Sequence, residues 1–228
     1  MAKIQLMLAA ETPRWIRRVV GYGFAALLIL IAAVAGALRA GAADQRELRN
    51  RMWRTEFAPN TASDWQIITD AGVTANFGDG GLALALPNAA TQALMLRAGA
   101  VGAWTLVVDA AQTAGAAGAM HGLAFNCVSE KACSYMLLNN NGYVEVFRQT
   151  GSERTVWLEL QQWPHVRRGS ATNRVQLAAA AGSVEVRLND ELLLRVPAQP
   201  GGLVGLAVHS RATAHSVTYA LAELRTEQ

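Results

Sequence analysis

The sequence predicts an all-β protein: a two-sheet antiparallel β-sandwich of the jelly-roll type, preceded by one transmembrane α-helix. Three observations lead to this prediction. Short segments in which apolar and polar residues alternate recur from Trp53 onward, and they are densest in 173–210. Turn-forming Gly, Asn and Asp residues separate these segments, and one uncharged apolar run stands near the N-terminus. Because period two buries one face of each strand, about a dozen such strands without helical periodicity between them require two packed sheets.

The apolar run extends from Val19 to Leu38 between Arg18 and Arg39. Its length matches the roughly 20 helical residues that cross the hydrocarbon core of a bilayer. A cleaved secretory signal is the alternative, since 40–42 reads A-G-A, but the apolar core of a signal is usually only about 7–15 residues long. We therefore predict four segments: a tail over 1–18, a transmembrane helix over 19–38, a juxtamembrane helix or linker over 39–52, and the β-sandwich over 53–228.

The charge of the chain is uneven. The formal net charge is +3, yet the residues up to Arg39 carry five basic and one acidic side chain, whereas the remainder carries 15 basic and 16 acidic ones. A nucleic-acid-binding domain keeps a basic patch on its folded part, so we expect no nucleic-acid partner. Arginines flank both ends of the apolar run, so the positive-inside rule does not fix its orientation.

Cys127 and Cys133 are the two cysteines of the chain, in the sequence CVSEKAC between two strand-like segments. A short hairpin would bring them within disulfide distance, which suits an oxidising compartment. Two free thiols buried in the core are the alternative. On the disulfide interpretation the protein is a single-pass protein of the cell membrane, with the β domain outside the cytoplasm.

Two hairpins can be placed from their turn residues. The strand 135–138 is followed by NNNG and then by 143–148, with Gly142 at a position that needs positive φ, and Asn189-Asp190 joins two further strands in the same way. The alternation predicts one core between the two sheets, made of Leu123, Phe125, Val144, Val146, Leu158, Val175, Leu177, Val186, Leu188, Val204 and Leu206.

Several motifs in this order resemble the concanavalin A-like lectin/glucanase superfamily, and more narrowly its laminin-G-like and 3-keto-disaccharide-hydrolase-like domains. They are GLAFNC from Gly122, NNNGYVEVFRQ from Asn139, Trp163-Pro164, Asn173-Arg174-Val175, VRLND ending at Asp190, and GGLVGLAVHS from Gly201. The resemblance covers about Trp53 to Leu224 and implies a β-sandwich. The last strand reads VTYALAEL and lacks the acidic pair usual there, and domains of this kind bind glycans, bind proteins or serve structure alone.

The carboxylates and histidines do not form a recognisable catalytic or metal-binding pattern. Glucanases of this superfamily carry E-x-D-x-x-E on one strand, and this chain has no such run. Glu145, Glu159 and Glu185 each occupy the polar phase of a strand, so we expect them to face solvent. The four histidines lack metal-ligand spacing, and His209 and His215 flank a turn, which predicts surface positions. We predict no catalytic residues, no metal and no cofactor.

Aromatic residues are the remaining candidates for a binding site. Tyr143, Phe147 and Trp157 lie on one face, opposite neighbouring valines, if their strands are regular. Sugars and protein partners both use such rings, although a second buried layer is the alternative. We therefore predict a non-catalytic, membrane-anchored binding module whose partners are the membrane and either glycans or membrane proteins. The alternatives are an accessory subunit of a larger membrane complex and a sugar-active hydrolase of the cell envelope.

Overall fold

The computed structural model describes residues 14–43, 50–78, 80–116, 118–199, 202–211 and 213–226. The chain divides into two units, Met1–Arg46 and Glu47–Gln228, and each is described by itself. Residues 1–13 of the predicted tail over 1–18 lie outside the described residues, as does the stretch 44–49, whereas 14–18 belong to the first helix. Residues 50–52, which the sequence placed in the juxtamembrane segment, belong to the first strand of the second unit.

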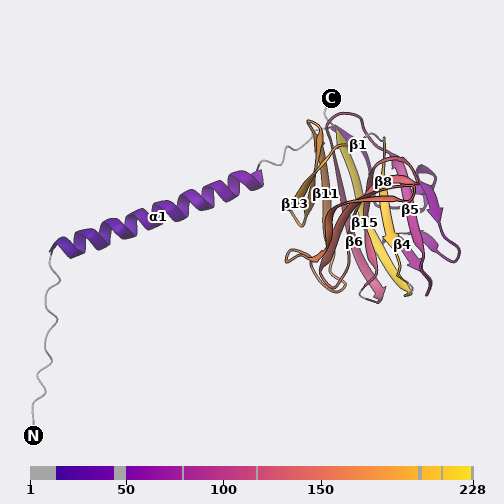
Figure 1. Cartoon of the computed structure of the whole chain (residues 1–228), viewed down its shortest axis with the longest axis horizontal. Helices are drawn as coiled ribbons and strands as arrows, with labels where there is room; N and C mark the ends of the chain where they lie inside the picture. Colours follow the sequence, from indigo (N-terminus) through magenta and orange to yellow (C-terminus); the bar gives the residue numbers. More distant parts are fainter. Residues whose placement is uncertain are drawn as a thin grey trace, which may run out of the picture. The chain divides into compact units, whose positions relative to one another are not determined.

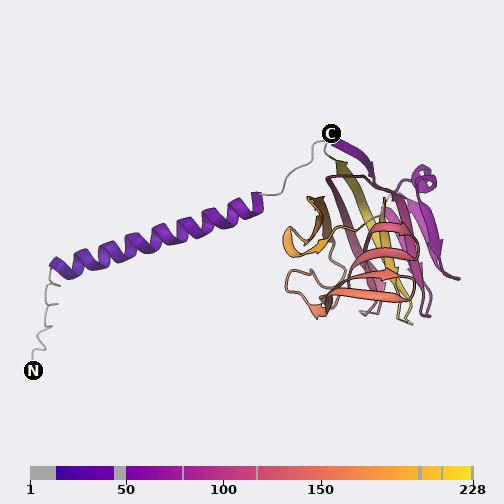
Figure 2. The same ribbon diagram turned by 45° about the horizontal axis from the view of Figure 1, so that its top comes forward.

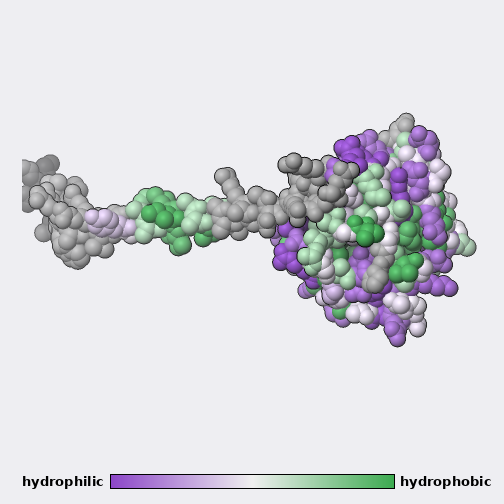
Figure 3. Space-filling model, turned by 90° about the horizontal axis from the view of Figure 1, so that it is seen from above, coloured by the Kyte–Doolittle hydropathy of each residue, from purple (hydrophilic) through white to green (hydrophobic). Residues whose placement is uncertain are grey.

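The first unit contains one α-helix, α1 (Arg14–Ala43), which covers the predicted span 19–38 and extends beyond it at both ends. Its described side chains, Val20 and 22–35, are exposed and mostly apolar, and they form the green stretch of the helix in Figure 3. Judged on the residues that the structure describes, no helix reaches the length and apolar character needed to span a membrane. The predicted transmembrane helix is therefore not confirmed by this structure.

The second unit is the predicted antiparallel two-sheet sandwich, with its strands in two layers (Figures 1 and 2). The eight-stranded sheet has the order β13-β12-β11-β6-β15-β4-β3, with β1 also paired to β15. Its strands are β1 (Asn50–Thr55), β3 (Thr74–Gly78), β4 (Gly81–Leu86), β6 (Trp104–Gly115), β11 (Asn173–Ala180), β12 (Ser183–Leu188), β13 (Glu191–Pro197) and β15 (His215–Thr226).

The seven-stranded sheet has the order β10-β9-β8-β7-β14-β5-β2. Its strands are β2 (Gln66–Thr69), β5 (Gln92–Ala98), β7 (Met120–Ser129), β8 (Ala132–Leu138), β9 (Tyr143–Thr150), β10 (Glu153–Gln162) and β14 (Leu203–His209), and a short 3₁₀ helix, η1 (Pro59–Asp64), follows β1. In Figure 2 the pink-to-orange strands β8 to β10 lie side by side at the front of this layer.

The predicted core is confirmed. All eleven listed residues pack in the apolar layer between the sheets, ten of them buried and Leu158 partly buried. Tyr219 crosses this layer from β15, and its hydroxyl donates to the carbonyls of Gly122 (3.3 Å) and Ala207 (3.0 Å) in the other sheet. The inward-facing side chains of the strands therefore pack the two sheets together.

The turn predictions are also confirmed. Gly142 has φ of 95°, and Asn189 and Asp190 have φ of 50° and 72°, the left-handed region that the β8–β9 and β12–β13 hairpins require. Asn189 also fixes the preceding loop, since its side-chain amide donates to the carbonyl of His165 (2.7 Å) and to Oδ1 of Asn173 (2.8 Å). Two of the motifs that carry the family resemblance, NNNGYVEVFRQ and VRLND, therefore serve to form hairpin turns.

Candidate functional site

The outer face of the seven-stranded sheet carries a second apolar cluster, separate from the core between the sheets. Its centre is a stacked pair of rings, Tyr135 on β8 and Phe147 on β9, with centroids 5.0 Å apart. We call this the outer cluster; its buried members are Leu94, Leu96, Met120, Ala124, Cys127, Cys133, Tyr135, Leu137, Phe147 and Ala207. Because these side chains are buried, this part of the outer face is packed and not solvated.

A charged pair lies against this cluster. The guanidinium of Arg154 on β10 sits 3.8 Å above the ring of Phe147, and its Nη2 donates to Oε2 of Glu145 at 2.6 Å. Arg211 approaches the other carboxylate oxygen at 3.9 Å. The side chain of Glu145 is only 7 % exposed, whereas those of Arg154 and Arg211 are 43 % and 59 % exposed. The acid therefore lies at depth, and the two guanidinium groups line its access to solvent.

These side chains border a hollow of about 290 Å³. Asp70 lies on its other side and is held by the edge of the sheet, since the backbone N–H of Gln92 donates to Oδ2 of Asp70 at 2.8 Å. His209, the last residue of β14, also lines the hollow, with its ring 5.5 Å from that of Tyr135. The polar lining is Asp70, Gln92, Glu145, Arg154, His209, Ser210 and Arg211, with Thr91 beside them.

His209 is neutral in this setting. Burial lowers its pKa to about 4, and the positive charges of Arg154 and Arg211 add to this lowering, while Asp70 opposes it. A neutral imidazole both donates and accepts a hydrogen bond. The hollow therefore combines two guanidinium groups, two carboxylates and a neutral imidazole beside an aromatic ring. This arrangement can bind a ligand that is rich in hydroxyl groups.

The predicted aromatic residues occupy three different environments. Tyr143 is 38 % exposed near the β8–β9 turn, and Phe147 is buried in the outer cluster. Trp157 packs instead against the core between the sheets, because the register of β10 on β9 shifts between Val156 and Leu158. The expectation that the three rings share a face is therefore wrong for Trp157. Val156 takes its place against the outer cluster.

Four expectations about exposed polar groups, at Glu145, Glu185, His209 and His215, are also wrong. Glu145 is buried, because the outer face of β9 is covered by the outer cluster and Arg154 supplies a partner at that depth. His215 is buried between the sheets, and His209 is partly buried where it lines the hollow. Glu185 is partly buried on β12, where its carboxylate accepts hydrogen bonds from Arg187 and Arg195. Glu159, by contrast, is exposed on β10 as expected.

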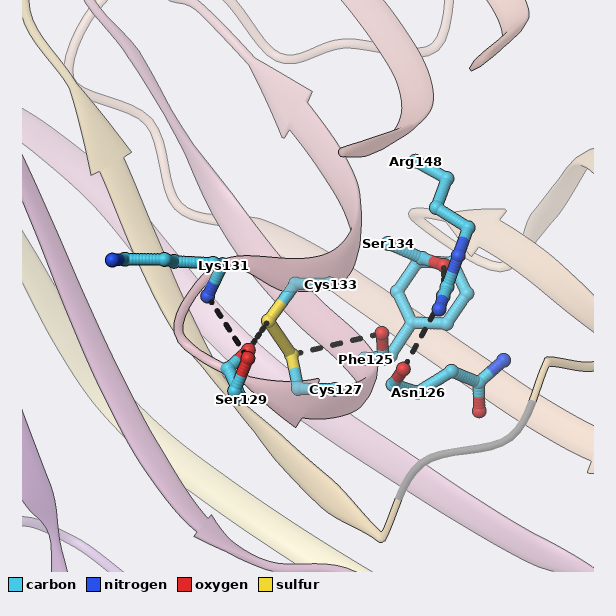
Figure 4. The surroundings of a disulfide bond; sticks show 8 residues. All are labelled: Phe125, Asn126, Cys127, Ser129, Lys131, Cys133, Ser134 and Arg148. Carbon is cyan, nitrogen blue, oxygen red and sulfur yellow. Dashed lines mark hydrogen bonds between the residues drawn. A yellow bond between two sulfur atoms is a disulfide. The ribbon is translucent and has the colours of Figure 1, made fainter. Parts of the chain in front are cut away.

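Cys127 and Cys133 form the predicted disulfide, which joins the ends of β7 and β8 with their Cα atoms 4.1 Å apart (Figure 4). Beside it, Nη1 of Arg148 donates to the carbonyl of Asn126 (3.4 Å) and to Oγ of Ser134 (3.2 Å). Both cysteines belong to the outer cluster. Cys133 lies on β8 two residues before Tyr135, and β8 pairs with β9 through Tyr135 opposite Phe147 and Leu137 opposite Glu145. The disulfide therefore fixes the end of β8 that precedes these two pairs.

A second hollow of about 220 Å³ lies at the outer face of the eight-stranded sheet. Its main feature is a two-pronged ion pair in which Arg174 donates to both carboxylate oxygens of Asp109, each at 2.8 Å. These polar groups are satisfied by one another, and no aromatic side chain lines this hollow. Within the residues that the structure describes, no three His, Cys, Asp or Glu side chains gather as metal ligands would.

Sequence reasoning missed four residues of the first hollow: Glu145, Arg154, His209 and Arg211. A signal for one of them was present, since Glu145 stands between Tyr143 and Phe147 in the phase that we had assigned to binding. Arg154 and Arg211 come from other segments, and only the arrangement of the strands brings them to Glu145.

Comparison with known proteins identifies the fold but not a family. No protein-family model matches the sequence, and no curated protein matches it either. Carbohydrate-binding module CBM66 from Bacillus subtilis is similar in structure, with a TM-score of 0.53 and 11 % identity, over 72 % of this chain and 96 % of that one. A protein of unknown function with a galectin-like fold from Bacillus subtilis has a TM-score of 0.55 and 11 % identity, over 80 % of this chain and 99 % of that one. The β-glucanase of Bacillus licheniformis has a TM-score of 0.57 and 8 % identity, over 78 % of this chain and 99 % of that one.

These similarities show that the second unit has the two-sheet β-sandwich fold of the three proteins named above, the fold that the sequence predicted. At such identities they establish the fold alone, because one fold supports binding modules and enzymes alike.

Proposed function

We propose that this protein is a non-catalytic binding module that takes a carbohydrate in the hollow between Asp70, Glu145, Arg154 and Arg211. The observation that carries the proposal is the Glu145–Arg154 pair, held at 2.6 Å and stacked at 3.8 Å on Phe147. Such a pair presents fixed donors and acceptors, which suits recognition of hydroxyl groups, since preorganised polar groups lose little entropy on binding. The structural likeness to a carbohydrate-binding module supports the same class of ligand.

The charges of the hollow favour a neutral glycan over an anionic one. Two guanidinium groups face two carboxylates, and His209 is uncharged at neutral pH. Binding of an anionic ligand would weaken steeply with added salt, whereas hydrogen bonding to a neutral sugar would not. A comparison of affinities at low and high salt therefore distinguishes the two.

Binding is proposed without catalysis because the carboxylate of Glu145 is engaged by Arg154 and approached by Arg211. A glycosidase needs one carboxyl that donates a proton and another about 5–9.5 Å away that attacks the sugar or activates water. In this hollow the second acid, Asp70, accepts a hydrogen bond from the backbone of Gln92. A sugar-active hydrolase is the alternative, and hydrolysis of a bound oligosaccharide that stops in Glu145→Gln would establish it.

The proposal is tested by measuring the affinity of the full chain for a panel of neutral and acidic oligosaccharides. For the panel member that binds, Arg154→Ala and Glu145→Ala should each lower affinity at least tenfold, because removal of one partner leaves the other unpaired. Glu159→Gln, at an exposed position of the same strand as Arg154, is the matched control and should leave affinity unchanged. Equal affinity in all three variants would place any binding site elsewhere.

We also propose that the α1 segment anchors the module at the cell membrane, with the sandwich outside the cytoplasm. The exposed apolar side chains of 22–35 and the disulfide, which suits an oxidising compartment, support this part. An accessory subunit that docks on a membrane-protein partner is the alternative for the same segment. Extraction of native membranes with alkaline carbonate tests anchoring: an integral protein stays in the pellet, and release into the supernatant would exclude it.

A further inference from the structure

The end of the sandwich that carries the hollow also buries three polar side chains between the sheets. They are Gln112 on β6, His121 on β7 and His215 on β15, exposed by 2 %, 1 % and 3 %. Each occupies the inward phase of its strand, since Val108, Leu123 and Val217 in the same phases belong to the core. Two imidazoles thus enter the core from opposite sheets.

Most of the polar atoms of this trio have no partner. Both ring nitrogens of His121, Nε2 of His215 and Oε1 of Gln112 are buried without a hydrogen bond. The other ends are fixed, since Nε2 of Gln112 donates to the carbonyl of Ala116 (2.8 Å) and Nδ1 of His215 lies 3.4 Å from the carbonyl of Thr213. A buried polar group without a partner costs free energy, and a buried charge without one costs far more.

The surroundings offer no charge to balance a protonated imidazole. Neighbouring strands place apolar residues beside the two rings: Leu86 of β4 pairs with His215, and Leu138 of β8 and Val208 of β14 pair with His121. Two ionisable groups on packed elements are engaged elsewhere: the Tyr219 hydroxyl donates across the core, and Arg211 approaches Glu145. His209 lies on the opposite face of β14. Among the described residues, no carboxylate forms a salt bridge with His121 or His215.

The trio also borders two connections between the sheets. Gln112 bonds to the β6–β7 connection at Ala116, and the β14–β15 connection, described at 210–211 and 213–214, links His209 to His215. The second connection carries Ser210 and Arg211, which line the hollow, and Met120 beside His121 lines it as well. His121 therefore follows a residue that lines the hollow, and His215 begins the strand after the connection that lines it.

We propose that Gln112, His121 and His215 form an acid-sensitive switch: proton uptake by the two buried imidazoles opens this end of the sandwich and releases the ligand from the hollow. The opening does not depend on what the hollow binds, and only the release of ligand rests on the proposed function.

The direction and size of the effect follow from the proton affinities of the two states. Burial, together with the neighbouring His215, lowers the pKa of His121 to about 3. Burial also lowers the pKa of His215, and the hydrogen bond to the Thr213 carbonyl opposes that lowering. In an open state both regain a pKa near 6.5. The closed end is therefore fully stable above about pH 6.5 and loses stability as pH falls toward 3. At about pH 5, His121 alone raises the open fraction about 30-fold.

Hydrogen exchange of the full chain tests the opening without any ligand. The reporters are the amides of Ala119 and Ser210, which bond to the carbonyls of Ala116 (3.3 Å) and Thr91 (2.8 Å) at this end. After correction for the intrinsic rate, their open fraction should rise at least about 30-fold from pH 7 to pH 5 in the natural protein. In His121→Leu and in His215→Leu, which are separate variants in case one fails to fold, the rise should shrink at least threefold. His165→Gln, at an exposed position, should behave like the natural protein.

An open fraction that does not change with pH, or that changes equally in the natural protein and both Leu variants, would overturn the switch. Affinity for the oligosaccharide found above is then measured over the same pH range, with His209→Gln to remove titration inside the hollow. Loss of affinity on acidification that persists in His209→Gln but not in His121→Leu supports release through the switch. Acid opening in a protein that binds no oligosaccharide at either pH would refute the glycan function and leave the switch standing.

Discussion

Replacement of Phe125 by Ala is expected to destabilise the sandwich strongly, because this ring lies at the centre of the core. Phe125 is fully buried on β7 and packs in the layer between the sheets. Removing a ring from such a position costs the transfer free energy of the lost atoms and the energy of the cavity, about 3–5 kcal/mol together. That loss is a large part of the roughly 5–15 kcal/mol by which a domain is stable.

Glu185→Ala on β12 provides the comparison at a polar position. From the alternation alone this change would cost under about 0.5 kcal/mol, as for an exposed residue. The structure raises the expectation to about 1–2 kcal/mol, because Arg187, whose side chain is 10 % exposed, would lose its carboxylate partner. Arg187 and Arg195 together hold the pKa of Glu185 below its usual range despite the cost of burial.

Urea unfolding of the full chain, followed by tryptophan fluorescence, measures both changes. Three of the six tryptophans, Trp53, Trp65 and Trp104, are buried in the core between the sheets and report its loss. The midpoint should fall in both variants with an unchanged denaturant slope, and it should fall at least twice as far for Phe125→Ala. A larger loss in Glu185→Ala would show that the inward and outward phases have been assigned the wrong way round.

Three further results are expected. Reduction of the Cys127–Cys133 disulfide should cost about 2 kcal/mol by the loop-entropy estimate, and mass measurement of unreduced, alkylated protein should find no modified thiol; two modified thiols would exclude the bridge. Tyr219→Phe should cost about 1–3 kcal/mol in the same urea assay, because two buried carbonyls lose their shared donor; no loss would mean that water replaces the hydroxyl. N-terminal sequencing of native protein should find residues 19–38 retained, whereas a sequence beginning at Ala43 would show cleavage after Ala42.

The family resemblance and the alternation came from local patterns, and both predicted the same fold. Phe125, Val186 and Leu206 could be assigned to the core because a strand has a fixed period of two, so that one apolar residue fixes the phase of its neighbours. Asn189, Asp190 and Gly142 could be assigned to turns because few residues accept positive φ. Such features depend on neighbouring residues alone, and the structure changes none of them.

The candidate site depended instead on which strands lie side by side. A regular period placed Trp157 with Phe147, but a shift in the register of β10 turns Trp157 into the core, and no local pattern marks that shift. In the same way the sequence showed Glu145 and His209 as single polar residues in alternating strands. Their burial follows from Arg154, Arg211 and the outer cluster, which reach them from β8, β10, β14 and the connection after β14. Apart from the irregular strand β10, the sequence by itself determined the inward face of the strands, because that is a property of one strand. The composition of the outer face was decided by the tertiary structure, because an ion pair or a hollow exists only between strands that the fold makes neighbours.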